Sequence, residues 1–341
     1  MSADATPIDT AASRPDIATP RRRGMVAGRG ALLAAALIFA LLALLPLFAV
    51  AIDDPFLMVT ATRIMIFALA ALSLDLVLGY GAMVSFGHAA YLGIGAYSVA
   101  ILASHGITDI LLQALAAILA SSLFAFLTGA IALRTKGVYF IMSTLAFGQM
   151  AYFFMVSLSA YGGDDGLTLS GRSTLLGFPV IQSDMALFYL VLAVLILSYA
   201  ALRTVVASRF GRVLRGTRDN SVRMQAIGFA PFRFQLTAYV IAGALAGIAG
   251  VFLANQAEFV SPAYMTWQRS GELIVMVVLG GMGTLIGAIG GAIAFMLVED
   301  WLAMISEHWK LGLGILLVMM VLFTRGGIAG GIERLTGRGQ Q

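Results

Sequence analysis

The chain has 341 residues, of which 60% are hydrophobic and only 11% are charged, and its formal net charge is +4. A soluble domain carries about 25% charged residues, so this composition excludes a water-exposed globular surface and indicates a polytopic membrane protein. Cysteine is absent, which excludes disulfides and cysteine-metal sites, and the three histidines His88, His105 and His308 lack metal-ligand spacing. In a membrane protein the basic excess reports orientation rather than nucleic-acid binding, so we expect no nucleic-acid partner.

The N-terminal residues 1–30 are polar, contain three prolines and end near the arginine run Arg21 to Arg23. This composition predicts a disordered cytoplasmic tail. A cleaved signal peptide is the alternative, and the small residues Ala49 and Ala51 favour it. However, the apolar run at 31–52 and the leader before it are both longer than in a typical signal peptide.

Apolar stretches continue along the chain up to residue 325, which predicts a transmembrane domain over 31–325. A helix needs about 20 apolar residues to cross the hydrocarbon, and backbone groups in lipid must be paired within the helix. The sequence therefore predicts an all-α bundle of about 8–10 transmembrane helices. The candidate spans are 31–52, 57–78, 83–103, 110–132, 138–158, 185–206, 235–256, 271–298 and 311–324.

Basic residues concentrate in alternate loops, which predicts that these loops and the N-terminal tail face the cytoplasm. Nine crossings would place the basic C-terminal tail, 326–341, on the outside. An even number, eight or ten, with both ends in the cytoplasm requires one apolar stretch to be broken, re-entrant or counted twice. The run 271–298 is the expected place because Gly280, Gly281 and Gly283 can break a helix. Its triplet Val278-Leu279-Gly280 also repeats Val77-Leu78-Gly79, as in transporters with similar halves.

The segment 203–233 holds seven arginines and a single acidic residue, Asp219. Arginine at a membrane centre costs about 2.5–3.5 kcal/mol, so this loop lies in water or against headgroups. One interpretation is a topology anchor that binds anionic membrane lipid. The order of the residues adds a second interpretation. Asp219 or Asn220 can cap a short helix over 221–227, Gly228 can end it, and such a helix can dock into a groove on a soluble partner.

Polar residues inside apolar spans are candidates for a translocation path, because they usually face the bundle interior. A structural role is the alternative for each of them. We find no catalytic triad, metal-ligand spacing or coupled carboxylate pair among them, which argues against an enzyme. The candidates are Asp75, Ser85, His88, Gln149 and Glu272.

Small residues at a spacing of four predict close helix packing. Gly243 and Gly247 form one such motif, and Gly283, Gly287 and Gly291 form another. The partner helix can belong to the same chain or to a second subunit.

Several long segments in order, covering residues 35–325, resemble the LivM-type permeases of branched-chain amino acid ABC importers. They are LVLGYGAMVSFGHAAYLGIGAY (76–97), RTKGVYFIMSTLAFGQM (134–150), GGDDGL (162–167), GRVLRGTRDNSVRMQAIGF (211–229), YVIAGALAGIAGVFLANQAEFVSP (239–262) and GELIVMVVLGGMGTLIGAIGGA (271–292).

The resemblance implies a type II ABC importer-like fold in the bacterial inner membrane and import of branched-chain or other hydrophobic amino acids. It also implies a sister LivH-like permease, a periplasmic substrate-binding protein and two cytoplasmic ATPase subunits that carry ATP-Mg, while this chain binds no cofactor. In the family the loop matching 208–228 couples to an ATPase. The residues carried over are Arg212, Arg215, Arg218, Asp219, Asn220, Arg223, Met224, Ala226 and Gly228.

The sequence departs from the family pattern at Ser221 and Gln225, where acidic residues are common, and it retains only an A-x-G fragment, Ala226 and Gly228, of the loop found in other importers. It contains no GxxxxGK[ST] phosphate loop, so ATP hydrolysis would need separate subunits. An ion-coupled secondary transporter acting alone, or an ABC permease for urea, amides or aromatic acids, remains the alternative.

Overall fold

The computed structural model describes residues 29–52, 55–305 and 311–315. Residues 29 and 30 belong to the first helix, and the rest of the expected N-terminal tail lies outside the described residues. So do the expected C-terminal tail at 326–341 and residues 316–324 of the last expected span.

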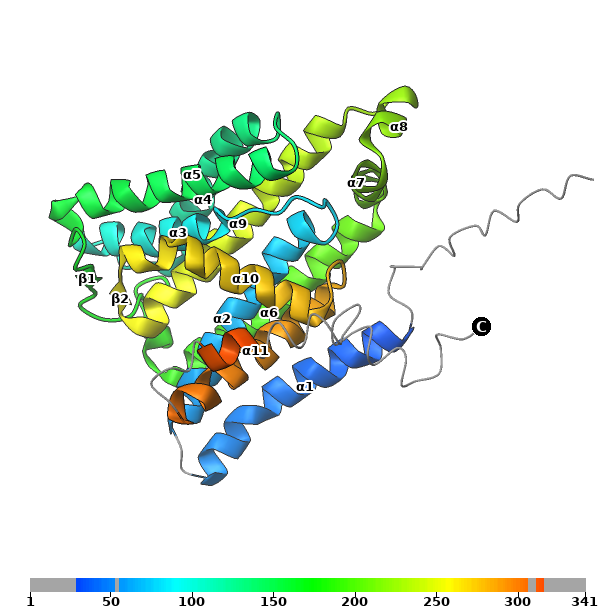
Figure 1. Cartoon of the computed structure of the whole chain (residues 1–341). Coiled ribbons are helices and arrows are strands. Elements are labelled where there is room, and N and C mark those ends of the chain that lie inside the picture. The colour runs from blue at the N-terminus through cyan, green and yellow to red at the C-terminus, as the bar shows by residue number, and fades with distance from the viewer. Residues whose placement is uncertain (1–28, 53–54, 306–310, 316–341) are drawn as a thin grey trace, which may run out of the picture.

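The described chain is almost entirely helical and has the all-α architecture that the composition predicts (Figure 1). Seven of its described helices are long and apolar enough to cross a membrane. Two short strands, β1 (Leu167–Thr168) and β2 (Phe259–Val260), pair antiparallel. The helices are α1 (Arg29–Ile52), α2 (Pro55–Leu78), α3 (His88–Ser104), α4 (Ile110–Ala132), α5 (Val138–Ser157), α6 (Asp184–Ala207), α7 (Arg209–Asp219), α8 (Ser221–Ala226), α9 (Pro231–Ala257), α10 (Trp267–Gly280) and α11 (Leu285–Ile305).

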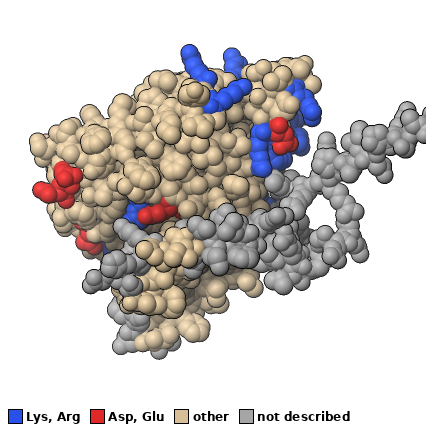
Figure 2. Space-filling view, viewed as in Figure 1, with Lys and Arg blue, Asp and Glu red and all other residues tan. Residues whose placement is uncertain are grey.

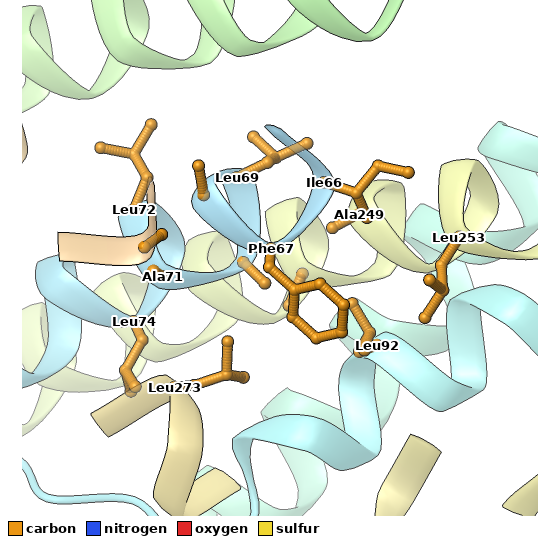
Figure 3. Close-up of a cluster of buried hydrophobic side chains, with 14 of the residues drawn as sticks. Ile66, Phe67, Leu69, Ala71, Leu72, Leu74, Leu92, Ala249, Leu253 and Leu273 are labelled. Carbon is orange, nitrogen blue, oxygen red and sulfur yellow. The ribbon is translucent and has the colours of Figure 1, made fainter. Parts of the chain in front are cut away.

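Helix α2 forms the centre of the bundle. Every residue from 64 to 80 is buried, as expected for a helix that is apolar on all sides. Helices α6, α9, α10 and α11 pack around it. Figure 3 shows this core, in which side chains of α2 meet Leu92 of α3, Leu253 of α9 and Leu273 of α10. The bundle is therefore organised around the buried part of α2, while the first turns of that helix remain partly exposed.

Glycines let the helices of this chain approach backbone to backbone. A Cβ on Gly243 would lie 2.7 Å from the Cβ of Ala125 in α4, and a Cβ on Gly247 would overlap Ser121 of the same helix. Gly287 and Gly291 of α11 face α10 in the same way. These predicted packing glycines thus contact helices of their own chain.

The bundle contains two breaks between consecutive helices. Residues 79–87 separate α2 from α3, and residues 281–284 separate α10 from α11. The expected span 83–103 therefore begins only at residue 88. The break expected within the run 271–298 is present, because Gly281 and Gly283, with φ of +110° and +77°, lie between the end of α10 and the start of α11.

Charge separates the two ends of the bundle (Figure 2). The end that carries α7 and α8, called the basic end here, holds Arg134, Lys136 and the arginines of 203–233. The opposite, acidic end carries β1, β2 and the connection between α5 and α6. There Arg172 bonds Asp184 at 2.5 Å and Glu258 at 3.2 Å, which ties this long connection to the end of α9.

Candidate functional site

At the basic end, helix α7 lies against the bundle along one apolar face. Ser208 caps it by accepting a hydrogen bond from the Phe210 N–H at 3.2 Å. Val213, Leu214 and Thr217 are buried, whereas Arg212 on the other face is exposed. The spacing of these apolar residues is that of an amphipathic helix, a signal for α7 that the predicted single helix over 221–227 does not include.

Helix α8 follows directly. The side chain of Asn220, rather than that of Asp219, caps it by accepting from the Arg223 N–H at 2.8 Å. Asp219 is the last residue of α7. Gly228 has a φ of +89°, and its N–H donates to the Gln225 carbonyl at 2.9 Å, which ends the helix.

The outer surface of α8 is apolar and exposed. Val222 and Ile227 are 68% and 62% exposed, and Ala226 and the following Phe229 are also exposed. Met224 instead packs against α7, because a Cβ on Gly216 would lie 2.7 Å from its sulfur. An exposed apolar surface within a basic loop is the type of surface that a soluble partner covers.

Two of the predicted coupling arginines contact the bundle. Arg215 donates to the carbonyl of Val206 at 3.1 Å, where it pairs an acceptor in the last turn of α6. Arg218 donates to the carbonyl of Gly79, the first residue of the break between α2 and α3. Arg212 and Arg223 are exposed. The arginines therefore divide into two that fix α7 to the bundle and two that face outward.

The two helix breaks meet at this contact. The Asp75 carboxylate of α2 is fully buried and accepts a hydrogen bond from the Gly283 N–H at 2.7 Å. A Cβ on Gly79 would overlap both the Asp75 carboxylate and the Gly283 backbone. Asp75 also interacts electrostatically with Arg218. We call Asp75, Gly79, Arg218 and Gly283 the junction, because they connect α7 to both breaks.

A second set of buried polar side chains surrounds the start of α3. The Nε2 of His88 lies 2.9 Å from the Ser73 hydroxyl of α2, and the Ser85 hydroxyl lies 3.3 Å from that of Tyr239. The Ala89 N–H donates to Ser270 of α10 at 3.0 Å, which pairs one of the free donors at the start of α3. His88, Ser85 and the Ala89 N–H therefore connect the first break and the start of α3 to α2, α9 and α10.

The remaining predicted path residues lie elsewhere. Gln149 is half-buried on α5 and has no polar partner among the described residues. Glu272 pairs with Arg269 at 2.6 Å in the first turns of α10. Arg63 and Glu299 share this region and were missed, although a charge inside the expected span 57–78 was a signal for Arg63. Within the part of the chain that the structure describes, no group of three or more His, Cys, Asp or Glu side chains could hold a metal.

Comparison with known proteins identifies the family. Residues 56–324 match the family model described as "Branched-chain amino acid transport system / permease component". The chain is 28% identical over 292 residues to the high-affinity branched-chain amino acid transport system permease protein LivM of Salmonella typhimurium, covering 79% of this chain and 68% of that protein. It is 26% identical to BraD, a permease protein of the same kind of system in Pseudomonas aeruginosa, covering 77% of this chain and 91% of that protein.

A relative named for a different substrate is the autoinducer 2 import system permease protein LsrC of Yersinia pseudotuberculosis, at 28% identity over 64% of each chain. No solved structure matches the chain. The family match covers most of the sequence and agrees with the helical, apolar fold. The chain belongs to the permease component family of branched-chain amino acid transport systems and is a multi-pass ABC importer permease subunit, not an enzyme.

Proposed function

We propose that this permease works with a sister LivH-like permease, two cytoplasmic ATPases that bind ATP-Mg and a periplasmic binding protein to import branched-chain or other hydrophobic amino acids. The membrane is the bacterial inner membrane. The basic end faces the cytoplasm, since arginine-rich loops stay inside, and both termini lie on that side. The surface of α8 docks on an ATPase, and this chain binds no cofactor itself.

One observation carries the mechanism: α7 reaches both helix breaks through Arg218. Movement of an ATPase against α8 displaces α7, because Met224 packs on Gly216. Movement of α7 in turn pulls on the Gly79 carbonyl, and Asp75 links that break to Gly283. Irregular backbone within a bundle lines the cavities and substrate sites of transporters, so force applied there can open and close the path.

The amino-acid substrate rests on the family and on the scarcity of polar side chains in the bundle. The LsrC relative shows that this kind of permease also occurs in systems named for another substrate. Substrate choice therefore needs a panel of compounds. Leucine, isoleucine and valine should stimulate ATP hydrolysis by the complete assembly in nanodiscs, whereas urea, short amides and aromatic acids should not.

An ion-coupled transporter that acts alone is the competing function. It predicts substrate flux in liposomes that contain only this chain and an ion gradient. Our proposal predicts no flux until the sister permease, the ATPases, the binding protein and ATP are all present.

A further inference from the structure

Four charged side chains of α2, α10 and α11 gather toward the acidic end of the bundle. Arg63 is the ninth residue of α2, about 12 Å along the helix at 1.5 Å per residue. Arg269 and Glu272 lie in the first turns of α10. Glu299 lies about 9 Å before the last residue of α11. None of these residues belongs to the junction or to the surface of α8.

Half of this group is paired and half is not. Arg269 bonds Glu272 at 2.6 Å and lies over the ring of Phe67, 5.5 Å from its centroid. Glu299 is 92% buried, and its Oε2 atom has no hydrogen-bond partner among the described residues. Arg63 is half-buried and makes no hydrogen bond or ion pair to the described residues. Glu299 nevertheless interacts electrostatically with Arg63, Arg269 and Glu272, and with the neighbouring acid Asp300.

The position of the group requires an occupant or a partner. Arg269 and Glu272 are 30% and 28% exposed on the flank of α10, next to apolar residues. Charged side chains at membrane depth do not face acyl chains; they face a bundle interior or a water-filled cavity. A buried carboxylate without a hydrogen bond is costly, and that cost falls when a cation enters.

We propose that these four residues form a transient binding site for a zwitterionic amino acid, in which Arg63 binds the α-carboxylate and Glu299 binds the α-ammonium group. We call it the outer charged site. This inference rests on the proposed function. The two unpaired charges of the site are of opposite sign, as are those at one end of a free amino acid. Phe67 and the surrounding apolar core provide an apolar environment for the side chain of the bound amino acid.

The pairing of Arg269 with Glu272 explains why the site would be selective. These two charges already neutralise one another and hold the start of α10 in place. A ligand with only a carboxylate leaves Glu299 without a cation, and a ligand with only an amine leaves Arg63 without an anion. The full zwitterion is the smallest ligand that satisfies both residues.

The test uses the complete assembly of permeases and ATPases in nanodiscs, without binding protein, so that the permeases supply the signal. Binding of tritiated L-leucine is measured at millimolar concentrations, with unlabelled leucine, 4-methyl-2-oxopentanoate and isoamylamine as competitors. Only leucine carries both charges. We expect each of the other two to compete at least about tenfold more weakly, because each loses one charge-assisted interaction.

Variants assign the binding to the residues. Arg63→Gln and Glu299→Gln should each weaken leucine binding about tenfold or more, and Arg63→Lys should retain most of it. The matched control is Arg172→Gln, which removes an arginine that pairs with two carboxylates at the same end of the molecule. The control should bind leucine like the unchanged protein.

Equal competition by leucine, the keto acid and the amine would overturn the inference without any variant. A second result would also overturn it: the unchanged assembly binds no leucine, and the Arg63→Gln variant no longer co-purifies with the sister permease. The charges would then serve contact between subunits. Leucine uptake by the full system with binding protein separates the two proposals. If the full system takes up leucine but shows no preference for the zwitterion over the keto acid and the amine, only the outer charged site is contradicted. If it takes up no amino acid at all, the proposed function is contradicted.

Discussion

The carboxylate of Asp75 accepts a hydrogen bond from the backbone N–H of Gly283 at 2.7 Å, across 208 positions of sequence. This bond joins the two helix breaks. It also places a buried carboxyl group beside the arginine that arrives from α7. The permease therefore has a direct physical connection between its arginine-rich loop and the irregular backbone inside the bundle.

Replacing Asp75 should reveal what this bond contributes. Asp75→Ala leaves the buried Gly283 N–H unpaired, at a cost of about 1–3 kcal/mol of unfolding free energy. Asp75→Asn keeps an acceptor oxygen and should cost less. Thermal unfolding of the purified variants measures the difference, and equal melting temperatures for the Ala and Asn variants would show that the bond does not hold the breaks together.

Gly79 is predicted to tolerate no side chain. In Gly79→Ala the new methyl group overlaps the Asp75 carboxylate and the Gly283 backbone, and overpacking of this kind costs about 1–3 kcal/mol. Gly290→Ala in α11 is the control, because a Cβ there meets nothing within 4 Å. It should be neutral or stabilising by up to about 1 kcal/mol, as alanine favours helix. Similar melting temperatures for both variants would contradict the close approach of the two breaks.

The surface of α8 should bind the ATPase through its apolar residues. Val222→Asp or Ile227→Asp would bury an unpaired carboxylate in the docked state, which costs several kcal/mol and weakens association by at least about a hundredfold. Membrane insertion should persist because all the arginines remain. Co-purification of the ATPases reports the effect, with Arg212→Lys as a control that keeps the charge. Normal recovery of the ATPases with both aspartate variants would leave the loop as a topology anchor only.

The position of the C-terminus follows from the second helix break. The break divides the expected span 271–298 into two helices. With the expected span 311–324 as a further crossing, the number of membrane crossings is then even. A reporter that is active only in the cytoplasm, fused after Gln341, should therefore be active. Activity of a periplasm-only reporter at the same position would show an odd number of crossings.

Much of this architecture is readable from hydropathy, because each lipid-spanning helix must be long, apolar and internally bonded. The limits expected for α4 match the structure, and those for α5 and α6 agree within one residue. The glycine cluster after Leu279 also pointed to a break. Other features depend on tertiary contacts. The late start of α3 follows from ties to Thr144 and Ser270 on helices that are distant in sequence.

The candidate site was only partly readable. The arginines of 203–233 marked the loop, but the sequence cannot show that Arg215 and Arg218 donate to backbone carbonyls of the bundle. Those contacts depend on where α7 lies, and α7 was missed although Phe210, Val213, Leu214 and Thr217 have helical spacing. Asp75 was selected for its charge, yet its partner Gly283 is a backbone group that no pattern of side chains reveals.

The most direct test of the account measures transport per ATP hydrolysed in an Arg218→Ala variant reconstituted with its partners. Arg218 joins α7 to the first helix break, while the surface of α8 is separate from it. We predict that the ATPases co-purify with the variant at the normal ratio and hydrolyse ATP, but that leucine uptake per ATP falls at least about tenfold. An unchanged ratio of uptake to hydrolysis would show that the coupling does not pass through Arg218 and the junction.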